Sequence, residues 1–221
     1  MESTPCDGLR VPTKEEWNYI INEMGYNRRG FVRIGNRLFF CIIPKSNSTD
    51  LLFSHNGEVK TMLLSVAMDY VENGYCIMLP MAGYRIDDTV RGTESALYAS
   101  ATKDDDGVWV LGVDTMDFIL ETKPFGENIC TAVRLVTQDS SMFKVDPIVI
   151  NGRNLYFAPS NLQRHSNGTF KFAKNFYDTV GEDNIFGEWK DLFDYNVYYS
   201  IEEYSRIVNL VNYKADHCLT Q

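Results

Sequence analysis

The chain of 221 residues is long enough to bury a full hydrophobic core, and its 44% hydrophobic and 23% charged residues are typical of a globular protein rather than a disordered or fibrous one. The formal net charge of -9 argues against nucleic acid as a partner, because Lys and Arg contacts with phosphate dominate that kind of binding. No run approaches the roughly 18 consecutive apolar residues of a membrane helix, and the first residues lack the pattern of a signal peptide, so we expect no membrane insertion.

The cysteines are 5 in number and show no CxxC spacing. An odd count without paired spacing argues against a zinc site or a dense disulfide framework. We therefore expect mostly buried thiols. A pairing of Cys6 with Cys218 stays open if the two ends of the chain meet.

The first predicted element is a helix that begins after Thr13, where Glu16 completes a capping box. Gly25 stands where a C-terminal cap is wanted. One apolar stripe recurs at helical spacing and consists of Trp17, Ile20, Ile21 and Met24. We expect this helix to cover a sheet, with Trp17 as a core anchor.

A hairpin is predicted over residues 31–43, with its turn at Gly35–Asn36 and its end at Pro44. A second amphipathic helix is predicted to end at Asn73–Gly74. Its apolar residues at helical spacing are Val59, Met62, Leu63, Val66, Tyr70 and Val71.

The rest of the chain reads mainly as short strands separated by polar loops. A buried strand is predicted over 75–80, a further hairpin turns at Asn151–Gly152, and another strand covers 169–173. A terminal helix is predicted from Ile201 onward. Two helices followed by a loop-rich antiparallel sheet predict an α+β fold with the helices packed on one side.

Four runs resemble sequence blocks of a known family. RVPTKEEWNYIINE (10–23), LPMAGYR (79–85), LYASAT (97–102) and TAVRLV (131–136) occur in order and at plausible spacing. They resemble blocks of the Fibrobacter succinogenes major paralogous domain family and, more distantly, of formylglycine-generating-enzyme-like domains. The resemblance implies a C-type lectin-like fold.

A fifth run matches the family in a different order. Residues 154–184, followed by EWKDLFDY (188–195), resemble a segment that in the family precedes the first of these blocks. This order implies circular permutation, which is tolerated where the termini of a fold lie close together. The alternative is a chain built from the end of one domain and the beginning of the next.

Permutation implies a single domain over 1–221. Residues 1–136 would then hold the helices and the C-terminal family blocks, 137–150 a joining linker, 151–200 the N-terminal block, and 201–221 a terminal helix or docking tail.

The resemblance brings no catalytic set with it. Relatives in the formylglycine-generating branch use a cysteine pair, whereas Cys130 stands alone, and the sugar-binding calcium motifs of other relatives are missing. We expect no enzyme activity, no cofactor and no metal. The acidic turn at Asp104–Asp106 is typical of a solvated loop, and calcium binding there stays open.

Sheet-supported loops carry the candidate ligand-binding residues, as functional loops on rigid scaffolds commonly do. The loops span Tyr84–Glu94, Thr102–Val108 and Thr115–Asn128. Their candidate residues are Tyr84, Arg85, Asp87, Asp88, Arg91, Tyr98, Asp104, Asp105, Trp109 and Phe125. The alternative for Tyr84, Tyr98 and Trp109 is a place in the core of the sheet.

Two functions fit the sequence. The first is a recognition module that binds a glycan or protein receptor and is displayed on a cell surface, pilus or virus particle. The second is a structural assembly subunit, for example a phage head or tail decoration, that binds neighbouring subunits or copies of itself. We expect an extracellular surface or virion location, and the oligomeric state is open.

Overall fold

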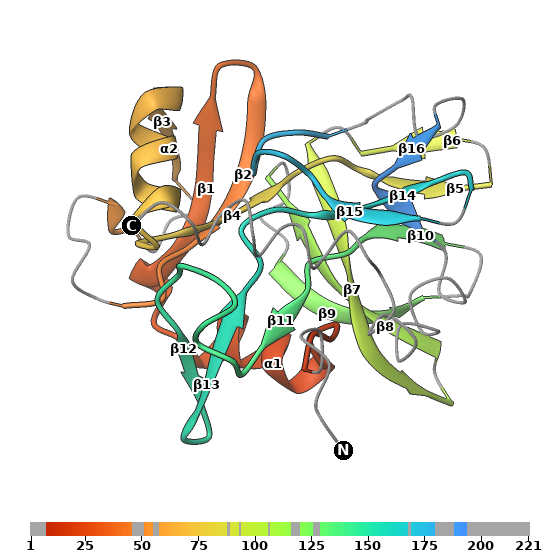
Figure 1. The fold of residues 1–221 in the computed structure, drawn as a ribbon, viewed down its shortest axis with the longest axis horizontal. Helices are drawn as coiled ribbons and strands as arrows, with labels where there is room; N and C mark the ends of the chain where they lie inside the picture. Colours follow the sequence, from red (N-terminus) through yellow and green to blue (C-terminus); the bar gives the residue numbers. More distant parts are fainter. Residues whose placement is uncertain are drawn as a thin grey trace.

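The computed structural model describes residues 8–45, 51–54, 58–87, 89–92, 94–105, 107–115, 120–125, 129–167, 169–179 and 188–193, with the backbone alone for 120–125 and 193. Sheet dominates these residues, and the two α-helices are short, which confirms a sheet-rich α+β chain (Figure 1). The helical elements are α1 (Lys14–Asn18), a π-helical turn (Tyr19–Glu23), a 3-10 turn (Tyr26–Arg28) and α2 (Leu64–Glu72).

The strands form four sheets among the described residues. They are β1 (Arg29–Ile34), β2 (Arg37–Ile42), β3 (Val59–Met62), β4 (Ile77–Pro80), β5 (Tyr84–Ile86), β6 (Thr89–Arg91), β7 (Ser95–Asp104), β8 (Gly107–Asp114), β9 (Leu120–Phe125), β10 (Ile129–Ala132), β11 (Val136–Thr137), β12 (Ile148–Ile150), β13 (Arg153–Phe157), β14 (Leu162–His165), β15 (Phe170–Phe172), β16 (Trp189–Lys190) and β17 (Leu192–Phe193).

The predicted capping box opens α1. The Thr13 hydroxyl accepts a hydrogen bond from the Glu16 amide at 3.3 Å, and the Glu16 carboxylate accepts one from the Thr13 amide at 2.8 Å. Two free backbone donors are thereby satisfied at the helix start. Beyond Asn18 the helix widens into the π-helical turn and ends at Met24, and Gly25 has a φ of 17°, outside the left-handed cap conformation.

The predicted hairpin over residues 31–43 is confirmed by β1 and β2, which pair antiparallel around Gly35–Asn36. The sheet continues in the order β3-β1-β2-β4. β3 lies parallel to the outer edge of β1.

The predicted start of the second helix is wrong. Val59 and Met62 belong to β3, because the free edge of β1 offers them a ladder of backbone hydrogen bonds that outweighs their helical spacing. α2 begins only at Leu64, and Ala67 is its one buried residue. Leu63 is 72% exposed, so it does not belong to an inward-facing stripe.

The largest sheet has the order β6-β5-β10-β7-β8-β9, with β17 also paired to β10. β7 and β8 form its long antiparallel hairpin. The predicted antiparallel character holds for most pairs, while β10 runs parallel to β7 and β3 runs parallel to β1.

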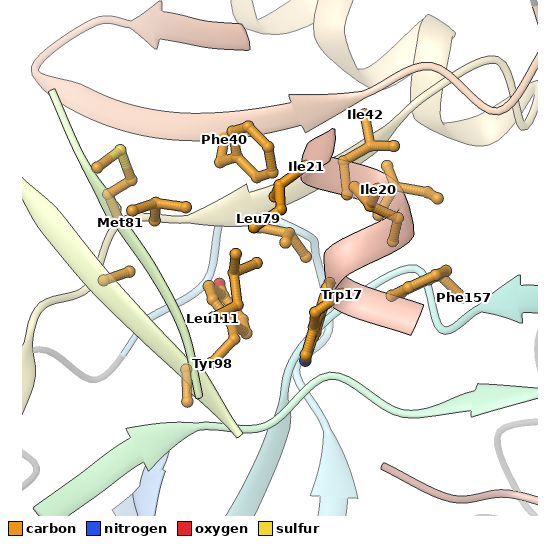
Figure 2. Close-up of a cluster of buried hydrophobic side chains, with 14 of the residues drawn as sticks. Trp17, Ile20, Ile21, Phe40, Ile42, Leu79, Met81, Tyr98, Leu111 and Phe157 are labelled. Atoms are coloured by element: carbon orange, nitrogen blue, oxygen red, sulfur yellow. The ribbon is translucent and has the colours of Figure 1, made fainter. Parts of the chain in front are cut away.

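One hydrophobic cluster contains side chains from residues 1–136 and from residues 151–200. Trp17 is 0% exposed and lies beside Phe157, with Tyr98 and Leu111 on its other side (Figure 2). Leu192 of β17 belongs to the same cluster. The prediction of Trp17 as a core anchor is confirmed.

The segment 137–150, predicted as a joining linker, carries regular structure and core residues. Thr137 pairs with Tyr156 across β11 and β13, and β12 forms the predicted Asn151–Gly152 hairpin with β13. Met142 and Phe143 are buried. The segment therefore contributes to the core. The polar residues at 137–141 made it resemble a linker in the sequence.

The prediction of buried thiols is confirmed for Cys41, Cys76 and Cys130, which are all buried and form no disulfide. A hydrogen bond with Cys76, together with burial, raises the pKa of the Cys41 thiol well above its ordinary value. Cys6 and Cys218 lie outside the described residues.

Candidate binding surfaces

The first group of predicted site residues lies on the β5–β6 hairpin. Ile86 pairs with Thr89, so Asp87 sits in the connecting turn, where its φ is 53° and its side chain is exposed. Asp tolerates this left-handed conformation better than most residues. Arg85 donates hydrogen bonds to the Asp87 main-chain oxygen and to the Cys130 sulfur, both at 2.9 Å, so its guanidinium is held against the hairpin.

Two further members of this group differ in exposure. Arg91 is exposed, whereas Tyr84, directly opposite it, is half-buried and packs against the cluster formed by Leu97, Val110 and Ile129. The core interpretation of Tyr84 is therefore partly correct. Its ring supports the hairpin that carries Arg91.

The second group lies on the β7–β8 hairpin. The Trp109 indole N–H donates a hydrogen bond to the Asp104 carboxylate at 2.6 Å. The Lys14 ammonium lies over the same ring, 3.0 Å from its centre. Trp109 is half-buried, and Asp104 and Asp105 are exposed. A tryptophan fixed on two sides is thus presented at the surface by a long hairpin.

The Trp109 cluster, which consists of Trp109, Asp104 and Lys14, is anchored at both ends. Lys14 opens α1, and its amide donates to the Thr102 hydroxyl of β7 at 3.0 Å. The helix start and the hairpin therefore hold their side chains in fixed relation. Such pre-organisation lowers the entropy lost when a ligand binds.

The two groups lie at opposite ends of β7. Gly83, next to β5, donates a backbone hydrogen bond to Ser95 at the start of β7, whereas Asp104 ends the strand. The partners of Ser95 and Asp104 in β8 are Asp114 and Gly107, and a strand advances about 3.3 Å per residue, so roughly 23 Å separates the two ends. Figure 1 shows β5 and β6 at one end of the sheet and the free end of the β7–β8 hairpin at the other. The predicted residues form two surfaces.

Tyr98 lies on neither surface. Its side chain is 0% exposed, its hydroxyl donates to the Pro80 main-chain oxygen at 2.8 Å, and Asn161 donates to that hydroxyl at 3.2 Å. Burial raises its pKa to about 12. Tyr98 is therefore a core residue, because its strand runs through the centre of the sheet and its face there meets α1.

Arg134, which the sequence reasoning did not single out, lies at the centre of this buried network. Its guanidinium donates three hydrogen bonds, to the Asn161 side chain at 2.9 Å and to the main-chain oxygens of Ala158 and Met78 at 2.8 Å each. Asp191, also 0% exposed, acts electrostatically on Tyr98 together with Arg134. An arginine among apolar residues, as in the run TAVRLV (131–136), is the sequence signal that could have revealed the network.

The sequence reasoning also did not find a third cluster, which consists of aromatic and charged side chains. On the sheet β15-β14-β16, the rings of His165 and Trp189 meet edge to face with centres 4.9 Å apart, and the Lys171 ammonium lies 3.8 Å from the centre of the Trp189 ring. His165 also pairs with Glu188 at 3.2 Å. Trp189 comes from β16, which lies beyond the β14–β15 hairpin in the sequence, so no local motif predicts the contact.

Two predicted site residues cannot be placed. Asp88 lies outside the described residues, and so does the Phe125 side chain, although the Phe125 backbone pairs with Val108. Most of the predicted loop Thr115–Asn128 falls in the same gap.

No group of three or more His, Cys, Asp or Glu side chains within the described part of the chain is placed to hold a metal ion. Of the acidic turn, Asp104 and Asp105 are described and Asp106 is not. A small pocket of about 190 Å³ lies beside the β1–β2 turn, where Arg37, Glu94 and Thr179 contribute to its lining.

Comparison with protein-family models, with curated proteins and with solved structures finds no match to this chain. No helix among the described residues is long and apolar enough to cross a membrane.

Proposed function

We propose that this chain is a non-enzymatic recognition module, displayed on an extracellular surface or virus particle, that binds a glycan or a protein receptor through its sheet-supported loops. The Trp109 cluster carries the proposal. Its indole ring is half-exposed and is fixed by Asp104 at 2.6 Å and by Lys14 at 3.0 Å from the ring centre. A rigid aromatic anchor flanked by polar groups is typical of recognition sites.

We further propose a C-type lectin-like fold with circularly permuted blocks in one domain. The backbone hydrogen bonds support this. Val136 pairs with Phe157, and the Leu162 amide donates to the Val133 oxygen at 2.9 Å, so the run that closes the family pattern lies along the run that should open it. Joining two such neighbouring strands and opening the chain elsewhere leaves a core of this kind intact.

The β5–β6 hairpin supplies a second, separate part of the recognition surface in this proposal. Arg91 and Asp87 are exposed there, and Arg85 is held by its contacts to Asp87 and Cys130. Because roughly 17 Å of β8 lies between Trp109 and Asp114, the partner of Ser95 at the end of β7 next to β5, one small ligand does not reach both surfaces. A polymer or a protein surface does.

The test of the recognition function compares the wild-type chain with Trp109→Ala and Tyr26→Ala on a glycan array. Tyr26 is 53% exposed and serves as a matched aromatic control. Binding that is lost in Trp109→Ala and retained in Tyr26→Ala supports the proposal. Equal binding by the wild type and Trp109→Ala contradicts the assignment of the site, and the absence of any bound glycan contradicts the glycan form of the proposal.

A second candidate function, the assembly subunit, is favoured by an exposed apolar surface at the start of α2. Leu63, Leu64 and Val66 are 72%, 40% and 40% exposed. Neighbouring exposed apolar side chains often mark contacts between proteins. In this alternative, the partner is a neighbouring subunit or another copy of the chain.

Light scattering after size-exclusion chromatography separates the two candidates. A stable trimer or larger ring that dissociates in Leu63→Ser but not in Val149→Ser favours the assembly subunit, since Val149 is 52% exposed and lies on β12, away from α2 in the sequence. A monomer at all concentrations contradicts self-assembly.

A further inference from the structure

The sheet β15-β14-β16 brings two cations to one place. Arg164 of the central strand pairs directly with Lys190 of β16 on one side and with Phe170 of β15 on the other. Side chains of directly paired residues project from the same face of a sheet. Arg164, Lys190 and Phe170 therefore share a face, and all three are half-buried.

The two cations have no carboxylate partner among the described residues. The Arg164 guanidinium carbon lies 5.9 Å from the centre of the Phe170 ring, and its Nε is buried without a hydrogen-bond partner. Glu188, two residues before Lys190, pairs instead with His165 at 3.2 Å. His165 follows Arg164 in the strand, so its side chain projects from the opposite face.

This arrangement is unfavourable without a ligand. Like charges directly opposite each other destabilise a sheet, and a buried donor without an acceptor adds to the cost. An oxyanion between the two side chains removes both effects, because a guanidinium donates two parallel hydrogen bonds to a planar carboxylate and binds sulfate similarly. The cation pair is all the more notable in a chain of net charge -9.

We propose that Arg164 and Lys190 form a binding site for the carboxylate or sulfate group of an acidic saccharide, with the sugar ring against Phe170. The saccharide class rests on the glycan form of the proposed function, while the site itself is separate from the Trp109 cluster. The half-buried Phe170 ring supplies an apolar face beside the cations, which a free inorganic anion does not use.

The experiment is calorimetric titration of the full chain with three tetrasaccharides, namely hyaluronan (carboxylate only), keratan sulfate (sulfate only) and fully N-acetylated chitotetraose (neutral). The variants are Arg164→Gln and Lys190→Gln. Lys171→Gln is the matched control, because it removes a cation from the same sheet on the face of Gln163, its direct partner in β14. Melting temperatures identify any variant that fails to fold, and Lys190→Gln on the short outer strand is the safer of the two.

We expect an acidic tetrasaccharide to bind, chitotetraose not to bind, and each of the two site substitutions to weaken binding by about tenfold, the factor expected for one lost charge-assisted hydrogen bond. The affinities for hyaluronan and keratan sulfate show whether the site binds a carboxylate or a sulfate. No binding of either acidic sugar, equal binding of chitotetraose, or an equal loss in Lys171→Gln overturns the proposal. Loss of this site with retained Trp109-dependent binding leaves the recognition function standing.

Discussion

The rings of Trp17 and Phe157 lie with their centres 5.5 Å apart. This contact joins α1 to β13, which is distant from it in the sequence. The Trp17 indole N–H also donates to the Ala99 main-chain oxygen at 2.9 Å. Three separate parts of the sequence thus meet at one buried side chain. The stability of the chain should depend strongly on it.

Replacement of Trp17 by Ala should lower the free energy of unfolding by about 3–5 kcal/mol, as deletion of a large buried aromatic does. Chemical denaturation measures the change. The exposed Tyr26→Ala serves as the control, and surface substitutions usually stay within about 0.5 kcal/mol. A loss below about 1 kcal/mol for Trp17→Ala would show that the cavity is filled by other side chains.

A chain that ends at Thr137 should not unfold cooperatively. It lacks Leu155, Phe157 and Leu192, which belong to the same hydrophobic cluster as Trp17. β11 also loses its partner β13. Circular dichroism during heating measures the transition. A sharp two-state melt of the shortened chain would favour two incomplete neighbouring domains over a permuted single one.

Arg134→Met should destabilise the chain by roughly 3–5 kcal/mol, the range for removing one member of a buried charged network. The substitution leaves the Asn161 oxygen and the main-chain oxygens of Ala158 and Met78 without their donor. Arg153→Met is the control, since Arg153 is exposed. Equal denaturation midpoints for the two variants would mean that the network contributes little net stability.

Local patterns predicted the elements whose hydrogen bonds are local. The capping box at Thr13 and the turns at Gly35–Asn36 and Asn151–Gly152 involve neighbours in the chain. Val59 and Met62 show where local patterns fail. Their spacing is helical, but they form a strand because they pair with the edge of β1, and residue spacing does not reveal such a partner.

The candidate site was predictable only in part, for a similar reason. Trp109 and Asp104 lie five residues apart on one hairpin, so their proximity can be predicted from the local sequence. The β5–β6 group lies at the other end of β7, and this separation depends on strand order, which the sequence does not reveal. Arg164 and Lys190 meet only through a pairing of strands distant in sequence.

The chain should lose stability between about pH 10 and pH 12 through Tyr98, whose pKa is raised from its ordinary value of 10.0 to about 12. A raised folded-state pKa means that this contribution is fully present below pH 10 and is lost as the pH rises through 12. Two pKa units correspond to roughly 2–3 kcal/mol.

The measurement compares the pH dependence of unfolding in the wild type and Tyr98→Phe. The variant should be less stable at neutral pH, because the hydroxyl bonds to Pro80 and Asn161 are lost. It should also show a shallower decline above pH 10, because the phenylalanine that replaces Tyr98 does not titrate. Parallel curves would show that Tyr98 remains protonated or unfolds locally without linkage to the global transition.

The last prediction separates two neighbouring carboxylates. Asp104 and Asp105 are both exposed at the end of the β7–β8 hairpin, but Asp104 accepts the Trp109 indole N–H at 2.6 Å. Neither Asp104→Ala nor Asp105→Ala should change the melting temperature much, because exposed carboxylates contribute little to stability. Asp104→Ala should weaken binding of a glycan found on the array by about tenfold, since the ring then loses the hydrogen bond that fixes its orientation. Asp105→Ala should have a smaller effect. Equal losses in both variants would point to the charge of the turn rather than to the orientation of Trp109, and no loss in either would move the binding surface to the β5–β6 hairpin, where Asp87 and Arg91 are the next residues to replace.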